Sequence, residues 1–341
     1  MTFLLLLILF IIGCALYAKR EMGDMPSPAE LKSYESLPYF HNGTFQSIRP
    51  QEVDFKNVRN AKNNQFSFMH FFLKSRFAPD RPLPCEPLNR ESFSKQPESF
   101  GFYWLGHSSV ILELNGKRIF FDPVFENAAP LPLFVPRYGD SPLSLTDLPP
   151  IDLVIITHNH YDHLERKAIQ ALKDALFVVP LGVGSALRGW GVNPAHITEL
   201  GWGESAEGDG LTITAERTSH FSGRGLADKN KTLCNSYILQ SEDKRLFFAG
   251  DTGYTSHFAE IGAQYGPFDL VALEIDGWNT GWRNTHLFPH EVIQAMKDLK
   301  SINLLPVHWG VFDLAFHPWT ESIEMVINDA QKTDIRPITP I

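Results

Sequence analysis

The chain has 341 residues, 43% hydrophobic and 20% charged, with 39 acidic against 30 basic side chains and a formal charge of −9. This composition supplies a large core and excludes a disordered or collagen-like chain. The acidic balance indicates no nucleic-acid partner, because such binding rests on neutralising phosphates. Three cysteines without a C-x-x-C pair exclude a disulfide framework and a cysteine-rich zinc module, whereas thirteen histidines stand out.

The N-terminus carries a membrane signal. Residues 3–18 contain no charged side chain and are followed by Lys19 and Arg20. The run is too apolar for a soluble helix and shorter than the roughly 20 residues of a comfortable span. Residues 1–20 are therefore expected to be a membrane-targeting segment rather than a buried core helix. Residues 11–14 resemble a bacterial lipobox, which would make Cys14 a lipidated terminus; a signal anchor is the alternative, and the side of the membrane stays open.

A linker and arm are predicted over residues 21–98, because residues 21–60 are polar and irregular. Residues 65–75 form an aromatic cluster, for which packing on the main domain is favoured over a lipid-facing patch. The main domain is expected to span residues 99–341.

From residue 99 short β-rich runs alternate with turns and helical segments. Asn115-Gly116 predicts a hairpin turn, and no glycine-rich phosphate-binding motif follows a strand. Two sheets packed face to face with helices outside fit this mixture better than a doubly wound parallel sheet. The predicted strands are 100–104, 110–114, 118–122, 152–157, 177–180, 211–216, 236–240, 245–249, 270–275 and 303–307, and the predicted helices are 165–175, 290–299 and 320–331.

A histidine-rich motif follows the apolar strand 151–157 and reads H-x-H-x-D-H. Side chains alternate in an extended segment, so His158 and His160 point the same way. Asp162 and His163 then turn into the next helix. The motif thus offers two imidazoles to one metal, and a carboxylate with an imidazole to a second. Imidazole and carboxylate together suit zinc or a similar divalent ion.

Three later strands end on further candidate ligands. Residues 211–219 lead to His220, residues 245–250 to Asp251, and residues 303–307 to His308. Strand-terminal loops on a stiff sheet are a common place for site residues. Their recurrence downstream of H-x-H-x-D-H predicts that these loops gather into one metal site.

The motif with its later His, Asp and His resembles the metallo-β-lactamase superfamily. Its flanking stretches resemble the N-acyl-phosphatidylethanolamine-hydrolysing phospholipase D family over about residues 99–320. The resemblance implies an α+β fold, a four-layer αβ/βα metallo-β-lactamase sandwich, with residues 99–341 as the catalytic domain. The stretches that carry it are 104–109, 121–125, 148–152, 157–164, 222–224 with 228–231, 248–254 and 307–310.

The resemblance also implies two Zn²⁺ ions and assigns their ligands. The first ion would be held by three histidines, the second by one aspartate and two histidines, and a further aspartate would bridge them. Asp162 and Asp251 would also be catalytic. In that order the ligands are His158, His160 and His220, then Asp162, His163 and His308, then Asp251.

Two more histidines are weighed against structural roles. His286 matches a family position that meets the substrate head group; the alternative is a residue that caps the helix at Pro289. His107 is expected to support a ligand rather than to be one. Residues 274–280 depart from the family because they are acidic, and their carboxylates could repel a phosphodiester or bind a cationic group of the substrate.

The activity implied is that of a zinc-dependent phosphodiesterase of the phospholipase D type. It would hydrolyse N-acyl-phosphatidylethanolamine-like lipids to phosphatidate and N-acylethanolamine, with a phospholipid and the membrane as partners. The alternatives are a metal-dependent hydrolase of a non-lipid phosphodiester or a lactone, and a non-enzymatic metal-binding or scaffold protein that retains the fold. The sequence carries no signal for an oligomeric state.

Overall fold

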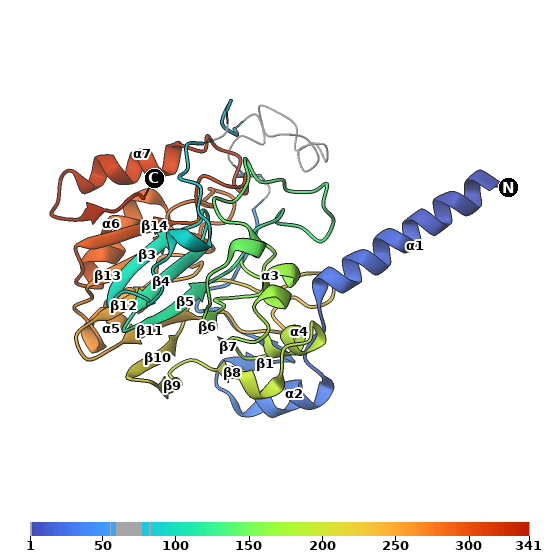
Figure 1. Ribbon diagram of the computed structural model, residues 1–341, viewed down its shortest axis with the longest axis horizontal. Helices are drawn as coiled ribbons and strands as arrows, with labels where there is room; N and C mark the ends of the chain where they lie inside the picture. The colour runs from blue at the N-terminus through green and yellow to red at the C-terminus, as the bar shows by residue number, and fades with distance from the viewer. Residues whose placement is uncertain (1, 55, 59–76, 82, 341) are drawn as a thin grey trace.

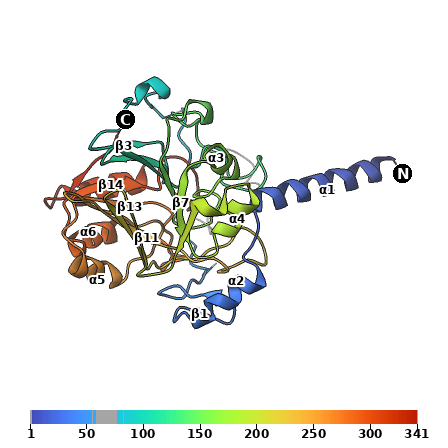
Figure 2. The ribbon, with the colours of Figure 1, turned by 60° about the horizontal axis from the view of Figure 1, so that its bottom comes forward.

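Two large β-sheets form the centre of the molecule. The computed structural model describes residues 2–54, 56–58, 77–81 and 83–340, so the aromatic cluster predicted at 65–75 lies outside the described residues. The sheets lie face to face and helices cover their outer faces (Figure 1, Figure 2). This arrangement confirms the predicted αβ/βα sandwich.

The first sheet comes from the N-terminal half of the sandwich. Its strands are β3 (Phe100–Trp104), β4 (Val110–Leu114), β5 (Lys117–Phe121), β6 (Leu153–Ile155), β7 (Leu176–Pro180) and β8 (Ile197–Leu200). They lie in chain order, antiparallel from β3 to β5 and parallel from β5 to β8. The β4–β5 hairpin turns at Asn115 and Gly116, whose φ values of +51° and +74° are those a two-residue hairpin loop requires. Helices α3 (Arg166–Ala171) and α4 (Gly184–Gly189) supply part of the apolar layer that packs with this sheet.

The second sheet comes from the C-terminal half. Its strands are β9 (Ser205–Gly208), β10 (Leu211–Glu216), β11 (Ser236–Gln240), β12 (Arg245–Phe248), β13 (Leu270–Glu274), β14 (Asn303–Val307) and β15 (Arg336–Pro337). Strands β9 to β12 are antiparallel neighbours and β12 to β15 parallel ones. Helices α5 (His257–Gln264), α6 (Pro289–Asp298) and α7 (Glu321–Ala330) supply the apolar side chains that pack with this sheet.

A dry layer of side chains joins the two sheets. The rings of Phe121 and Phe248, one from each sheet, stack with centroids 3.7 Å apart. Every residue of β4 and β13 is buried, because both faces of these strands are covered. Close packing of this kind makes the sheets stiff. Loops that leave the strand ends are therefore held in fixed relative positions.

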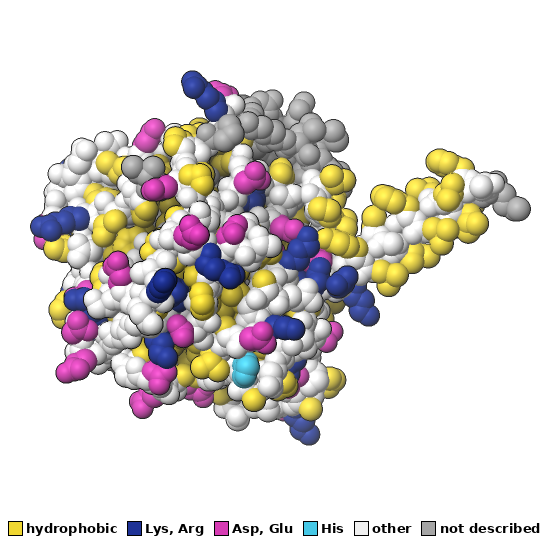
Figure 3. Space-filling model, in the orientation of Figure 1, with side chains coloured by type: hydrophobic (Ala, Val, Ile, Leu, Met, Phe, Trp, Pro, Cys, Tyr) yellow, Lys and Arg dark blue, Asp and Glu magenta, His cyan; other side chains and the backbone are white. Residues whose placement is uncertain are grey.

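The N-terminal segments lie outside the sandwich. Helix α1 (Thr2–Met22) projects from the body, and apolar side chains cover its surface up to the basic residues at its base (Figure 1, Figure 3). It is long and apolar enough to cross a membrane, a test that a signal sequence also passes. Helix α2 (Pro28–Ser33) and the hairpin of β1 (Phe40–His41) and β2 (Thr44–Phe45) follow. Tyr34 and Leu233 belong to one apolar cluster, so this part of the arm packs on the domain. Short 3₁₀ helices occupy Tyr34–Ser36, Arg90–Ser92, Leu145–Asp147 and Pro194–His196.

Candidate metal centre

The seven predicted ligands lie at one end of the sandwich, in loops that follow strands of both sheets. The motif residues 158–163 follow β6 of the first sheet. His220 follows β10, Asp251 follows β12, and His308 directly follows β14 of the second sheet. All but His160 are buried. The fold thus brings together residues that are up to 150 positions apart in the sequence, from 158 to 308.

Three histidines form what we call the first cluster: His158, His160 and His220. One nitrogen of each lies within 4.8 Å of the others. His160 Nδ1 is 2.9 Å from His158 Nε2 and 3.2 Å from His220 Nε2. Burial lowers the pKa of His160 and of His220 to about 3, and the neighbouring imidazoles act in the same direction. The rings are therefore neutral at pH 7 and have lone pairs to offer a metal.

A carboxylate and two histidines form the second cluster: Asp162, His163 and His308. Asp162 Oδ2 lies 3.4 Å from His163 Nε2 and 3.4 Å from His308 Nε2. His107 approaches the same oxygen, with its Nε2 at 3.0 Å. Because that nitrogen contacts a candidate ligand atom, His107 is placed to orient Asp162, and it also forms a potential ligand group with Asp162, His163 and His308.

Asp251 lies between the two clusters. Its Oδ1 is 3.3 Å from His163 Nε2 and its Oδ2 is 3.0 Å from His308 Nε2, both in the second cluster. The same Oδ2 is 3.7 Å from His220 Nε2 and 3.9 Å from His158 Nε2, in the first. A carboxylate in this position is able to reach ions on both sides.

The donor atoms at this centre fit a divalent cation. His163 Nε2, His308 Nε2 and Asp251 Oδ1 are buried side-chain atoms without a hydrogen-bond partner, although they lie close together. Burial opposes a charge on His163 and His308, but Asp251 and the carboxylates around it outweigh this and raise the pKa of both residues well above the usual value. The same negative potential that favours protonation of these nitrogens also attracts a metal cation. Imidazole and carboxylate are the ligands that Zn²⁺ and similar ions prefer.

Buried groups outside the clusters orient their rings. His163 Nδ1 lies 2.8 Å from Asp122 Oδ2, and that carboxylate in turn accepts bonds from the Thr157 amide at 2.8 Å and hydroxyl at 2.6 Å. His220 Nδ1 lies 3.0 Å from the Thr285 carbonyl oxygen, to which it donates. Each contact fixes one ring nitrogen and directs the other toward the centre. Hydrogen bonds of this kind commonly orient histidines that bind metals.

His286 lies beside the centre and caps no helix. Phe288 is the N-cap of α6, and Glu291 accepts a bond from its amide at 3.0 Å, so the capping interpretation of His286 is wrong. Instead His286 Nδ1 is 2.6 Å from Glu274 Oε2, and its ring centroid is 5.1 Å from that of His220. His286 also shares a potential ligand group with Asp251, Glu274 and His308.

The acidic stretch after β13 is satisfied within the protein. Glu274 Oε1 accepts a bond from the Thr252 amide at 2.8 Å. Asp276 is buried, with Oδ1 3.1 Å from His317 Nε2 and 2.7 Å from the Ser322 hydroxyl. Both carboxylates therefore have protein donors as partners.

From the sequence alone Asp122 had no expected role, and Glu274 was one acid of a stretch that could repel a phosphodiester or bind a cationic group. Both are buried, and each contacts a histidine of the site or beside it. A signal was available, because Glu274 ends β13 and Asp122 directly follows β5. An acid at the end of an apolar strand is the same pattern that identified Asp251.

The chain resembles known proteins over most of its length. A family model described as a beta-lactamase superfamily domain matches residues 117–309, which include all seven candidate ligands. An uncharacterized protein of Mycobacterium tuberculosis is 37% identical over 316 residues, covering 90% of this chain and 83% of that protein. N-acyl-phosphatidylethanolamine-hydrolyzing phospholipase D 1 of Caenorhabditis elegans is 32% identical, covering 69% of this chain and 70% of that one.

A solved structure gives the same result for the fold. Isothiocyanate hydrolase from Delia radicum gut bacteria superposes with a TM-score of 0.57 at 21% identity, covering 70% of this chain and 96% of that one. The match to the family model and the two-sheet architecture agree. The chain therefore belongs to the metallo-β-lactamase superfamily of metal-dependent hydrolases and is similar within it to the N-acyl-phosphatidylethanolamine-hydrolysing phospholipase D family.

Proposed function

We propose that the protein is a binuclear zinc phosphodiesterase of the phospholipase D type, acting on N-acyl-phosphatidylethanolamine-like lipids. The observation that carries the proposal is the place of Asp251, whose two carboxylate oxygens lie within 3.0–3.9 Å of nitrogens in both clusters. The lipid class rests on similarity to relatives that bear this activity in their names. The products are phosphatidate and an N-acylethanolamine.

Two clusters provide for two ions. In this proposal His158, His160 and His220 would hold the first ion, Asp162, His163 and His308 would hold the second, and Asp251 would be a ligand available to both. Bound in this way, a pair of divalent ions supplies an activated water at neutral pH and neutralises charge on the phosphoryl oxygens.

The chain's own carboxylates orient the reaction. The side chain of Asp162 is 12% exposed, whereas that of His163 beside it is fully buried, so Asp162 is the member of the second cluster that an entering water can reach. Asp162 and Asp251 hold the attacking water toward phosphorus. Attack forms a bond from the water oxygen to phosphorus and breaks the bond from phosphorus to the ethanolamine oxygen. The proton that the attacking water gives up passes through solvent to the leaving alkoxide.

His286 contacts the substrate head group in this proposal. Glu274 occupies its Nδ1, which leaves Nε2 as the ring nitrogen that can meet the substrate. The side chain is 13% exposed, so it is reachable from solvent while its ring lies against the centre.

Helix α1 places the enzyme at its substrate. Its apolar residues 3–18 enter the bilayer as a signal anchor, or as the leader of a lipoprotein whose lipid is attached at Cys14. A net charge of −9 does not draw the protein to an anionic membrane, so attachment depends on this helix.

The decisive experiment combines metal and lipid analysis on the purified full chain in vesicles that contain N-acyl-phosphatidylethanolamine. We expect two equivalents of zinc, and in H₂¹⁸O we expect the label in phosphatidate. Asp162→Asn is expected to lose hydrolysis, while Asp276→Asn, a buried aspartate outside both clusters, keeps it. Full hydrolysis by zinc-loaded Asp162→Asn would contradict the mechanism.

A substrate panel separates the rival activities. Hydrolysis of water-soluble diesters at a higher rate than the vesicle lipid would identify a non-lipid phosphodiesterase. Hydrolysis of simple lactones without any phosphodiesterase activity would overturn the proposal. Purified protein without bound metal or activity would indicate a scaffold.

A further inference from the structure

The C-terminal end of α1, which we call its base, packs against the catalytic domain. Glu21 is 8% exposed, and its Oε1 pairs with the Arg166 guanidinium at 2.7 Å. Trp190 Nε1 donates to the Arg20 carbonyl at 3.0 Å. Gly23 has a φ of +76°, and a Cβ there would lie 2.8 Å from side-chain atoms of Ala186 and Trp190. The chain therefore leaves the helix in a close-fitting contact with the catalytic domain.

Arg224 connects this junction to the loop that carries the H-x-H-x-D-H motif. The side chain is only 7% exposed. Its Nη2 donates to the Glu21 carbonyl at 2.8 Å, and its Nη1 donates to the carbonyls of Asn159 and Leu164, each at 2.8 Å. These two carbonyls lie on either side of three of the four motif ligands, His160, Asp162 and His163. One guanidinium thus holds both arms of the ligand loop and the end of α1.

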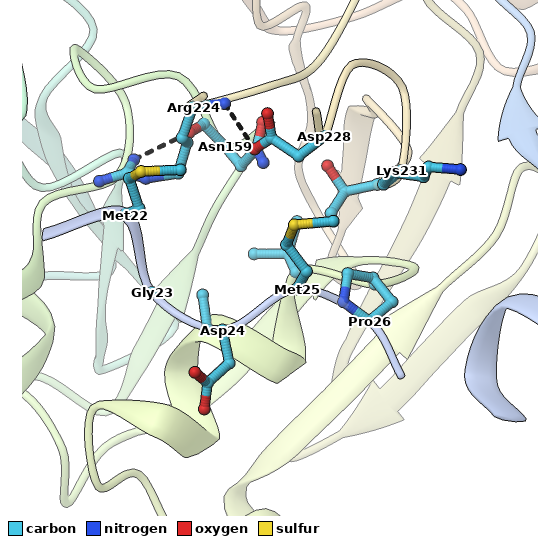
Figure 4. Close-up of a pocket in the computed structure, with 13 residues that line it drawn as sticks. Met22, Gly23, Asp24, Met25, Pro26, Asn159, Arg224, Asp228 and Lys231 are labelled. Atoms are coloured by element: carbon cyan, nitrogen blue, oxygen red, sulfur yellow. Dashed lines mark hydrogen bonds between the residues drawn. The ribbon is translucent and has the colours of Figure 1, made fainter. Parts of the chain in front are cut away.

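The position of Arg224 is itself fixed on several sides. Its amide donates to Asp228 Oδ2 at 2.8 Å, and its carbonyl accepts the Tyr161 hydroxyl at 2.9 Å. The Tyr161 ring lies over the guanidinium, 3.9 Å from its carbon. Figure 4 shows Arg224 beside Asn159 and Asp228, at a small pocket closed on the other side by residues 22–26. The proposed reaction gives this buried charge no role.

A guanidinium suits this position for a geometric reason. Arginine presents five donors in a rigid plane, so it can bind carbonyls on two sides at once, whereas lysine offers one flexible point charge. Residues that hold metal ligands in position without binding the metal themselves contribute to metal affinity. Their loss typically lowers metal affinity by about 10–100-fold.

We propose that Arg224 is a positioning residue that holds the ligand loop in its metal-binding shape and fastens it to the base of α1. It acts through the backbone of residues 159–164 and contacts none of the donor atoms. This inference rests on the proposed metal-binding role of the loop. It implies that the order of residues 19–26 and the metal affinity of the centre depend on each other, because coupling between two sites is reciprocal.

The test uses the full chain in detergent micelles and measures zinc dissociation constants by competition with a chelator. Arg224→Lys is expected to weaken zinc binding by about 10–100-fold. Arg188→Gln is the matched control: Arg188 joins the arm to the domain through an ion pair with Glu30, away from the ligand loop. We expect it to leave zinc affinity within about twofold.

A second measurement reports the coupling directly. In the wild type, zinc binding is expected to slow hydrogen exchange in the peptide spanning residues 19–26, and in Arg224→Lys it is expected to leave that exchange unchanged. Should Arg224→Lys not fold, Asp228→Asn provides the milder variant. It removes one of the two carboxylate oxygens that hold the amides of Arg224 and Gly225.

The possible outcomes distinguish a failure of this inference from a failure of the proposed function. If the wild type binds two zinc ions and Arg224→Lys binds them equally well, with unchanged coupling to residues 19–26, Arg224 is only structural and the inference is overturned. If the wild type binds no zinc, the metal centre itself is refuted.

Discussion

The two ligand clusters differ in charge although they lie side by side. The first consists of three imidazoles whose pKa values burial lowers, so it is neutral at pH 7. The second contains the Asp162 carboxylate. The carboxylate of Asp122, outside the cluster, contacts Nδ1 of its His163. Asp251 is the carboxylate nearest to the first cluster among the seven candidate ligands. We infer that an ion in the first cluster depends on Asp251, while an ion in the second keeps other negative neighbours.

Removing Asp251 tests this dependence and has the largest expected effect. We expect Asp251→Asn to weaken metal binding in both clusters by more than about 100-fold, the upper range for groups that merely orient ligands. The first cluster should lose its ion at lower chelator concentration than the second. Metal titration followed by mass spectrometry of the intact protein measures this. Equal retention of two ions would refute the bridging role.

Removing Asp122 is expected to affect the second cluster more than the first, because Asp122 contacts His163 directly but reaches His158 only through the Thr157 hydroxyl. Without this carboxylate His163 is no longer oriented, so Asp122→Asn should weaken one of two zinc sites by about 10–100-fold. Asp276→Asn is the control, because Asp276 also contacts a histidine, His317 at 3.1 Å, outside both clusters. Competition with a chelator gives the zinc dissociation constants of both sites. An equal loss of zinc affinity at both sites would contradict the prediction, because it would show that Asp122 supports the two clusters to the same extent.

His286 distinguishes substrate contact from metal binding. We expect His286→Ala to keep both metal equivalents and to raise KM about tenfold, since a hydrogen bond of about 1.4 kcal/mol is lost. Steady-state kinetics and metal analysis on the same preparation check this. Loss of one equivalent would instead assign His286 to the centre, where it lies within ligand distance of Asp251 and His308.

Changes in the apolar part of α1, residues 3–18, are expected to leave both clusters untouched. A lysine in the middle of an inserted helix costs about 2.5–3.5 kcal/mol, so Leu9→Lys should release the protein from vesicles without changing its zinc content. Leu176→Lys is the matched control, because Leu176 is also 55% exposed but lies on the body. Vesicle flotation measures binding. If Leu9→Lys stays bound, residues 3–18 are not the anchor.

Much of this architecture was predictable because its signals are local. Strands β3, β4, β10, β11 and β14 have the predicted ends, since apolar runs bounded by turns define them. Among the described elements the prediction missed several, such as α5, α4 and β9, which have eight, six and four residues. The ligand assignments and the domain boundaries stay predictions.

The supporting contacts were not predictable, because they join residues far apart in sequence. In the sequence Glu274 is one acid of an acidic stretch, and only the fold shows that the Thr252 amide and His286 contact it. Arg224 lies in a stretch that carries the family resemblance but had no expected role, and it contacts Glu21, 203 positions away. Composition and spacing report which side chains are present, whereas burial of a charge depends on what the completed fold places around it.

Each cluster draws on both sheets, and this has a consequence for biosynthesis. The chain emerges N-terminus first, so α1 is available to a membrane long before any ligand is made. The motif at 158–163 appears next, yet neither cluster is complete until His220 and His308 have followed. A chain that ends between residues 163 and 220 thus carries two of the three residues of each cluster, and both clusters are complete only when translation is nearly finished.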